Sequence, residues 1–130
     1  MITTKKAIAF CALSFAAGGS AMWAQQQAQS RREPQFENEQ LRVWKSIVMP
    51  GQPLALHRHE HGRALVSLNG GELQVIDGKK KVLDTYKLTA GKAIWLGADP
   101  PGQMHADVNP GKTPVEVIVV QLQQDTVKKK

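Results

Sequence analysis

Hydrophobic and polar residues alternate with a period of two along most of the chain from Leu41 onward. In the first run, Leu41, Val43 and Ile47 occupy one set of alternate positions, and Arg42 and Ser46 belong to the other set. A period of two is that of a β-strand, whose side chains point to two faces in turn. Similar short runs follow at residues 54–59, 64–68, 72–77, 82–88, 93–96, 105–108 and 115–122. No stretch after residue 40 has the length and periodicity of a long helix.

Turn-forming residues separate these runs, at Pro50-Gly51, Asn69-Gly70-Gly71, Asp77-Gly78, Ala90-Gly91, Asp99-Pro100-Pro101-Gly102 and Asn109-Pro110-Gly111. Many short strands with turn signals at this spacing predict an all-β sandwich or barrel. A chain of 130 residues has room for one such domain. We therefore expect a barrel over residues 41–123, a polar lead-in at 25–40 and a basic tail at 124–130.

Residues 1–24 have the pattern of a secretory signal peptide. Lys5 and Lys6 precede an apolar run, small residues follow, and the chain becomes polar at Gln25. This order predicts cleavage after Ala24, with Ala21 as the alternative site, and export to the periplasm. An anchor helix is the other interpretation, but the apolar run is short for a membrane span, so we expect no stable span.

The net charge of +6 comes from 17 Lys and Arg against 11 Asp and Glu. Two of the lysines lie in the predicted signal peptide and three at the C-terminus, so residues 25–127 carry 12 − 11 = +1. With this near-neutral body and 5% aromatic residues, the composition does not favour nucleic acid as a partner. The single Cys belongs to the predicted signal peptide and excludes an internal disulfide or a cysteine-based zinc site.

The histidines are the main candidates for chemistry. His57, His59 and His61 are spaced by two, so in an extended segment their side chains would share one face. His105 lies in a separate predicted strand. Two His from one strand and a third from another make three corners of a metal site that keeps positions open for water or a ligand.

Around these histidines the sequence resembles the cupin superfamily. The first cupin motif, with Gly, five residues, His-x-His and a later Gly, matches Gly51, His57-Arg58-His59 and Gly70. The second motif, Pro-x-Gly-x-x-His-x-x-x-Asn, matches residues 100–109 with His105. Residues 57–63 and 114–120 also resemble small cupins labelled β-alanine degradation proteins.

This resemblance implies a cupin-like double-stranded β-helix, which is a jelly-roll barrel, and a homodimer. It also implies a divalent transition metal (Zn, Fe, Ni, Cu or Mn) held by His57, His59 and His105. The alternative is a barrel that has kept the histidines and lost the metal.

The glutamate that cupins usually supply as a metal ligand is missing. Its position falls on Arg63, or on Ala64 if the gap is one residue longer. In this respect the chain is similar to the cupin thiol dioxygenases, which use three His without the Glu. Such a neutral ligand set implies that anions bind readily, and Arg63 could hold a carboxylate through two hydrogen bonds.

Asp107 and His61 are the remaining site candidates. In an extended strand Asp107 shares the face of His105, so it could pair with Arg63, accept a hydrogen bond from a ligating His, or ligate the metal itself. We favour the first two roles. His61 is expected at the rim, where it could replace a ligand or act as a general base.

Two functions remain open at this point. The favoured one is a binding module that captures a small ligand, such as a carboxylate, without turnover; its candidate ligand-binding residues are Arg63, Asp107 and His61. The alternative is a metal-dependent enzyme, of the dioxygenase or isomerase type, that acts on a small anionic substrate with His61 and Arg63 as candidate catalytic residues. The missing Glu favours the binding module. Tyr86 is expected to be a half-exposed strand residue rather than a donor to a ligand.

Overall fold

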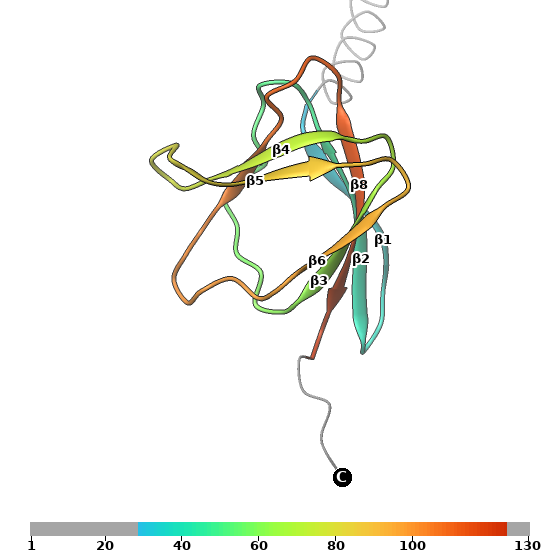
Figure 1. Ribbon diagram of the computed structural model, residues 1–130. Helices are drawn as coiled ribbons and strands as arrows, with labels where there is room; N and C mark the ends of the chain where they lie inside the picture. Colours follow the sequence, from blue (N-terminus) through green and yellow to red (C-terminus); the bar gives the residue numbers. More distant parts are fainter. Residues whose placement is uncertain (1–28, 125–130) are drawn as a thin grey trace, which may run out of the picture.

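The computed structural model describes residues 29–124, which form an all-β barrel of two antiparallel sheets (Figure 1). The strands are β1 (Arg31–Glu37), β2 (Leu41–Val48), β3 (Arg63–Ser67), β4 (Gly71–Ile76), β5 (Val82–Leu88), β6 (Ala93–Leu96), β7 (Ala106–Val108) and β8 (Val115–Leu122). One sheet has the order β1-β2-β8-β3-β6 and the other the order β5-β4-β7. The predicted all-β class and jelly-roll barrel are therefore confirmed.

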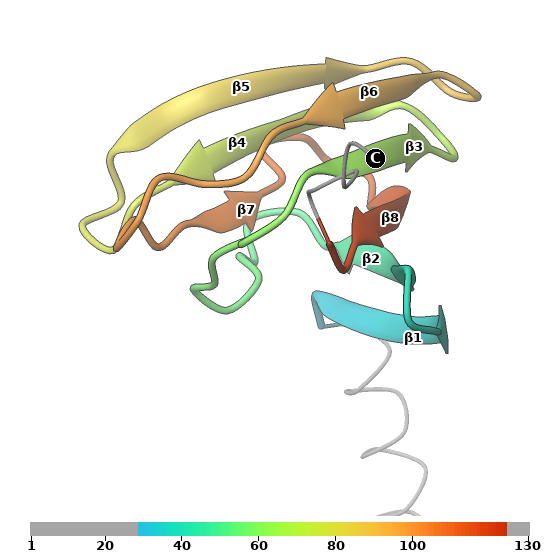
Figure 2. The ribbon, with the colours of Figure 1, turned by 90° about the horizontal axis from the view of Figure 1, so that it is seen from below.

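The two sheets face each other across a hydrophobic core (Figure 2). On β8 the alternate residues Val115, Val117 and Val119 are buried, with exposed fractions of at most 4%. They pack with Trp44, Val48, Leu54, Leu65, Leu73 and Leu88 from the other elements. The period-two pattern of the sequence thus separates the inner face of each strand from its outer face.

The first strand lies in the segment that we expected to be a polar lead-in. Among the described strands β1 forms the edge of the five-stranded sheet and pairs with β2 alone, and its register shifts between Pro34 and Phe36. An edge strand tolerates both charged side chains and a proline, because half of its backbone groups need no ladder partner. Because this segment lacks an apolar alternation, the sequence did not predict the strand. Arg32 of this strand lines the site.

The segment with the closely spaced histidines is not the regular strand that we expected over residues 54–59. Only His57 makes a β-bridge there, to His105. Side chains help to hold the segment in place of a regular ladder: the Asp99 carboxylate accepts from the His59 N–H at 2.7 Å, and Arg58 donates to the carbonyls of Asp99 and Pro100. Single backbone bonds at Leu54 and His59 add to these. These bonds replace the ladder, so the chain runs as a loop along the opening of the barrel.

Residues 29–124 contain no helix capable of crossing a membrane. The predicted signal peptide at residues 1–24 and most of the basic tail lie outside the described residues.

Candidate metal centre

The barrel brings together three of the four histidines. His57 and His105 exchange two backbone hydrogen bonds of 2.8 Å each, which places their rings 4.4 Å apart between centroids. The ring of His59 lies 4.8 Å from that of His57 and 5.4 Å from that of His105. One ring nitrogen of each His lies within 4.8 Å of the others, a spacing that a metal ion can bridge.

Each of these rings is held by an oxygen on its Nδ1 side. Nδ1 of His57 donates to the Ala55 carbonyl at 2.7 Å, and Nδ1 of His59 donates to Oε1 of Gln121 at 2.7 Å. Nδ1 of His105 lies 3.2 Å from Oδ2 of Asp99. Because an oxygen partner requires the proton on Nδ1, the lone pair of each ring is left on Nε2. Metal-binding histidines are oriented in this way by their non-ligating nitrogen.

The Nε2 atom of His57 indicates that a binding partner of the cluster is missing. It is buried, and among the described residues no group makes a hydrogen bond to it. A buried polar atom without a partner is costly, and a cation at the centre of the cluster would satisfy this one. The residues present therefore fit a divalent metal.

Burial keeps these imidazoles neutral. It is the main cause that lowers the pKa of His57, His59 and His105, and the nearby Arg63 lowers the pKa of His59 further, to about 3. Neutral imidazole is the form that binds a metal, so no proton has to be displaced near neutral pH.

Arg63 lies where the cupin glutamate is expected, at the start of β3, but its side chain is already engaged. Its Nη1 donates to the Gly97 carbonyl at 2.9 Å, and its Nη2 lies 3.8 Å from Oδ1 of Asp99. The side chain is only 5% exposed. The expected partner Asp107 is thus replaced by Asp99, because the turn after β6 brings Asp99 over the barrel opening.

Asp107 approaches the cluster on the His57 side. Its Oδ2 lies 3.6 Å from Nε2 of His57, which is too long for a hydrogen bond. Burial raises the pKa of the Asp107 carboxyl, and His57 and two arginines lower it. The metal-binding group found among the described residues comprises the three His without Asp107, so this carboxylate lies beside the cluster rather than within it.

His61 does not share the face of His57 and His59. The chain bends at Glu60 and His61, and His61 is absent from the cluster. The prediction of a shared face assumed an extended segment, which the loop does not provide. His61 is half-buried and makes contacts elsewhere in the structure.

Three residues of the site were missed in the sequence. Asp99 was interpreted only as part of a turn, and Arg32 only as part of the lead-in. Gln121 carried a usable signal, because it continues the inward alternation of Val117 and Val119 on β8. None of the three belongs to a recognisable motif, and their roles follow from where the strands meet.

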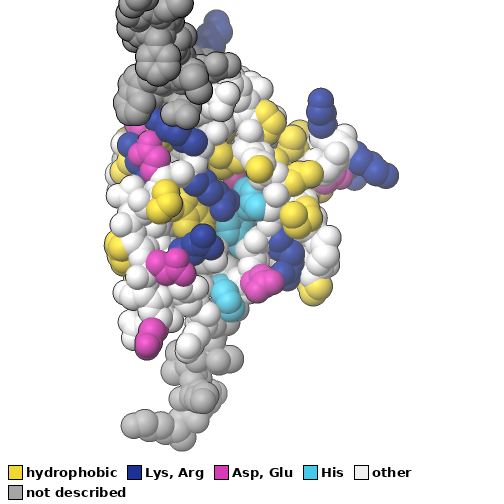
Figure 3. Space-filling view, turned by 180° about the vertical axis from the view of Figure 1, so that it is seen from behind, with side chains coloured by type: hydrophobic (Ala, Val, Ile, Leu, Met, Phe, Trp, Pro, Cys, Tyr) yellow, Lys and Arg dark blue, Asp and Glu magenta, His cyan; other side chains and the backbone are white. Residues whose placement is uncertain are grey.

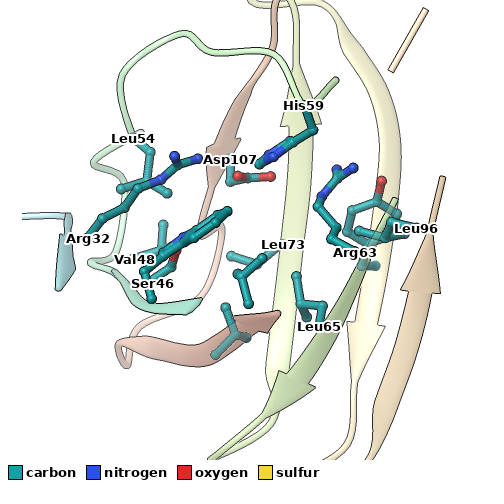
Figure 4. Close-up of a pocket in the computed structure, with 14 residues that line it drawn as sticks. Arg32, Ser46, Val48, Leu54, His59, Arg63, Leu65, Leu73, Leu96 and Asp107 are labelled. Carbon is teal, nitrogen blue, oxygen red and sulfur yellow. The ribbon is translucent and has the colours of Figure 1, made fainter. Parts of the chain in front are cut away.

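An interior cavity of about 20 Å³ lies beside the cluster (Figure 4). A water molecule needs about 10–15 Å³ by this measure, so the cavity can hold an ion and little more. Its polar lining comprises Arg32, Ser46, His59, Arg63, Tyr86 and Asp107. Tyr86 is half-buried and lines this cavity, so its position is compatible with both of the roles considered for it.

Comparisons with protein-family models and with curated proteins find no match. Solved structures do match. A cupin domain from Bordetella pertussis Tohama I is 22% identical with a TM-score of 0.62, over 74% of this chain and 95% of that chain. A double-stranded β-helix domain protein from Klebsiella pneumoniae is 27% identical with a TM-score of 0.53, over 72% of this chain and 76% of that chain.

An RmlC-like cupin family protein from Methanocaldococcus jannaschii is 15% identical with a TM-score of 0.55, over 73% of this chain and 81% of that chain. These likenesses agree with the resemblance to cupins that the two motifs of the sequence carry. The chain therefore has the cupin fold, the double-stranded β-helix.

Proposed function

We propose that the protein binds one divalent transition metal through Nε2 of His57, His59 and His105 and presents it to a small anionic ligand, without turnover. The observation that carries this proposal is the common orientation of the rings: each Nδ1 faces an oxygen, and the Nε2 atom of His57 is buried without a partner. A bound divalent ion would supply a Lewis-acidic centre that coordinates an oxygen ligand.

The anionic character of the ligand follows from the charges around the site. Neutral histidines leave the charge of the ion uncompensated, and the site's two carboxylates, Asp99 and Asp107, are matched by Arg63 and Arg32. A divalent ion would therefore add two positive charges to a balanced site, which favours an anion as the further ligand.

The metal content of the purified protein tests the proposal. Protein isolated from its host compartment should contain one equivalent of a transition metal by elemental analysis, and His57→Ala and His105→Ala should lose it. His61→Ala is the matched control, because His61 lies outside the cluster, and it should keep the metal. Metal-free native protein would contradict the proposal, and metal retained by both cluster variants would contradict the assigned ligands.

An enzyme of the dioxygenase or isomerase type is the second candidate. It is favoured by one observation, that Tyr86 and Asp107 both line the cavity beside His59 and could exchange protons with a substrate. Turnover of a small carboxylic acid by the metal-loaded protein, lost in Tyr86→Phe while metal content is kept, would support this candidate over the binding module.

Export to the periplasm and a homodimer complete the proposal. Export is supported by the basic, apolar and small segments of residues 1–24, and the homodimer by the resemblance to small cupins.

A further inference from the structure

We infer that Arg32, on the edge strand β1, binds the negatively charged group of the ligand, and that the ligand is a small carboxylate held between Arg32 and the histidine cluster. The inference rests on the proposed metal centre and names the chemistry of its ligand. It assigns to Arg32 the role that the sequence suggested for Arg63.

Arg63 is not available for an incoming anion. Its guanidinium is buried, donates to the Gly97 carbonyl and lies near the Asp99 carboxylate. Turning it toward a ligand would break this hydrogen bond and draw the buried guanidinium away from Asp99, which opposes binding. Arg63 instead holds Asp99, whose other oxygen faces the ring of His105.

The guanidinium of Arg32 is oriented by an aromatic ring and feels the charge of Asp107, but the two side chains form no hydrogen bond or ion pair. Its Cζ lies 4.8 Å from the centre of the Trp44 ring, a cation–π contact. Within residues 29–124 no oxygen accepts a hydrogen bond from it, so its N–H groups remain available. An arginine stacked on an aromatic ring keeps its planar fork free for a carboxylate.

Arg32 also lies between the interior cavity of the barrel and a groove on its surface. It lines the interior cavity with His59 and Asp107, and it lines an outer groove of about 280 Å³ together with His57. Figure 4 shows its side chain extending from β1 toward Asp107. In the space-filling view, histidine side chains lie in a hollow with Lys or Arg side chains beside them (Figure 3).

The two volumes indicate how the ligand would lie. The interior cavity holds little more than an ion, whereas the groove is close to the lower end of the range for small-molecule sites, about 300 Å³. Since Arg32 and His57 both line the groove, a small carboxylate in it would meet the guanidinium and the edge of the histidine cluster together.

Titration with acetate tests this inference, with acetamide as the neutral molecule of the same shape. The protein would be purified from its host, loaded with zinc as the probe metal and titrated by NMR. Arg32→Gln should weaken acetate binding about tenfold, which corresponds to about 1.4 kcal/mol, with zinc content unchanged. Arg32→Lys keeps the positive charge but loses the planar guanidinium group. Its acetate affinity should therefore lie between that of the unmodified protein and that of Arg32→Gln.

Arg42→Gln is the matched control. Arg42 lies on the neighbouring strand β2, is 61% exposed and lies 3.9 Å from Glu37, and it lines neither the interior cavity nor the outer groove. Its loss should leave acetate affinity within twofold of the unmodified protein, because the Arg42 charge is exposed to solvent and lies beside the Glu37 carboxylate, so it is largely screened.

Several results would overturn the inference: equal acetate affinity in Arg32→Gln, an equal loss in Arg42→Gln, or acetamide binding as tight as acetate. A failure of the metal centre is separately visible, as protein that binds no zinc. In that case the same titration on metal-free protein tests the role of Arg32. Weaker acetate binding in Arg32→Gln would support that role, and unchanged binding would contradict it.

Discussion

Single contacts decide what the histidine cluster can do. The ring of His59 lies parallel to that of Trp44, with centroids 6.0 Å apart, and its Nδ1 is held by Gln121. Such a ring has one orientation and one tautomer, and its pKa is lowered mainly by burial. The same features that prepare the ring for a metal make the metal-free protein sensitive to acid.

The stability of the metal-free protein should fall as the pH is lowered from about 6.5 toward 3. The pKa of His59 is about 3 in the folded protein against 6.5 ordinarily, so in this window the unfolded chain binds the additional proton. Stability then rises with pH by up to about 1.4 kcal/mol per pH unit for this group, and the lowered pKa values of His57 and His105 act in the same direction.

Urea unfolding at a series of pH values measures this dependence. The variant His59→Gln removes one of the titrating rings and should show a shallower slope. A slope that is unchanged in His59→Gln would contradict the assignment of the buried neutral imidazole.

Removal of Arg63 should destabilise the barrel even without a metal. Arg63→Met would leave the Gly97 carbonyl without its donor and Asp99 without its cation, at a cost of about 3 kcal/mol. Urea unfolding would measure the loss. Arg42→Gln, an exposed arginine on β2, should change stability by less than about 0.5 kcal/mol, and an equal effect of the two variants would rule out a structural role for Arg63.

At the scale of elements, the site depends on contacts between segments that are distant in sequence. The bridge between His57 and His105 joins the loop before β3 to the start of β7. Below it, Asn109 ties β2 to the turn before β8, with Nδ2 donating to the Val48 carbonyl at 2.9 Å and to the Thr113 carbonyl at 2.6 Å. The Asn that ends the second motif therefore links segments of the barrel and is not part of the site.

Asn109→Ala should therefore destabilise the fold by about 2 kcal/mol or more, because it removes a buried side chain and its hydrogen bond to the carbonyl of the buried Val48. Asn69→Ala is the matched control: Asn69 makes the same kind of bonds, to the Pro114 carbonyl and the Glu116 N–H, but it is exposed. Its loss should cost about 1 kcal/mol or less. Thermal unfolding of both variants compares them, and equal losses would contradict the role of Asn109 as a buried link.

At the scale of the whole molecule, the two ends of the chain carry most of the net charge, while the barrel itself is close to neutral. Export would remove two of the lysines and the single Cys with residues 1–24. The form that acts in the cell is therefore expected to be a near-neutral barrel with a basic tail.

Intact mass of the protein from a periplasmic fraction should correspond to a chain that begins at Gln25, or at Met22 if cleavage follows Ala21. Light scattering of the same sample should give twice the mass of the mature chain, as a homodimer requires. Uncleaved protein in the cytosol would contradict the proposed export, and a monomer mass would contradict the proposed dimer.

The period-two alternation and the two His-containing motifs were enough to predict the barrel, its cupin fold and the three histidines that come together. Alternation determines which face of a strand is buried, and this depends only on local order along the chain. The sequence could not show that the loop after Ala55 bends His61 away, that Asp99 rather than Asp107 pairs with Arg63, or that Arg32 faces the site. Those outcomes depend on which strands lie side by side and how a turn crosses the barrel opening, which only the tertiary structure decides.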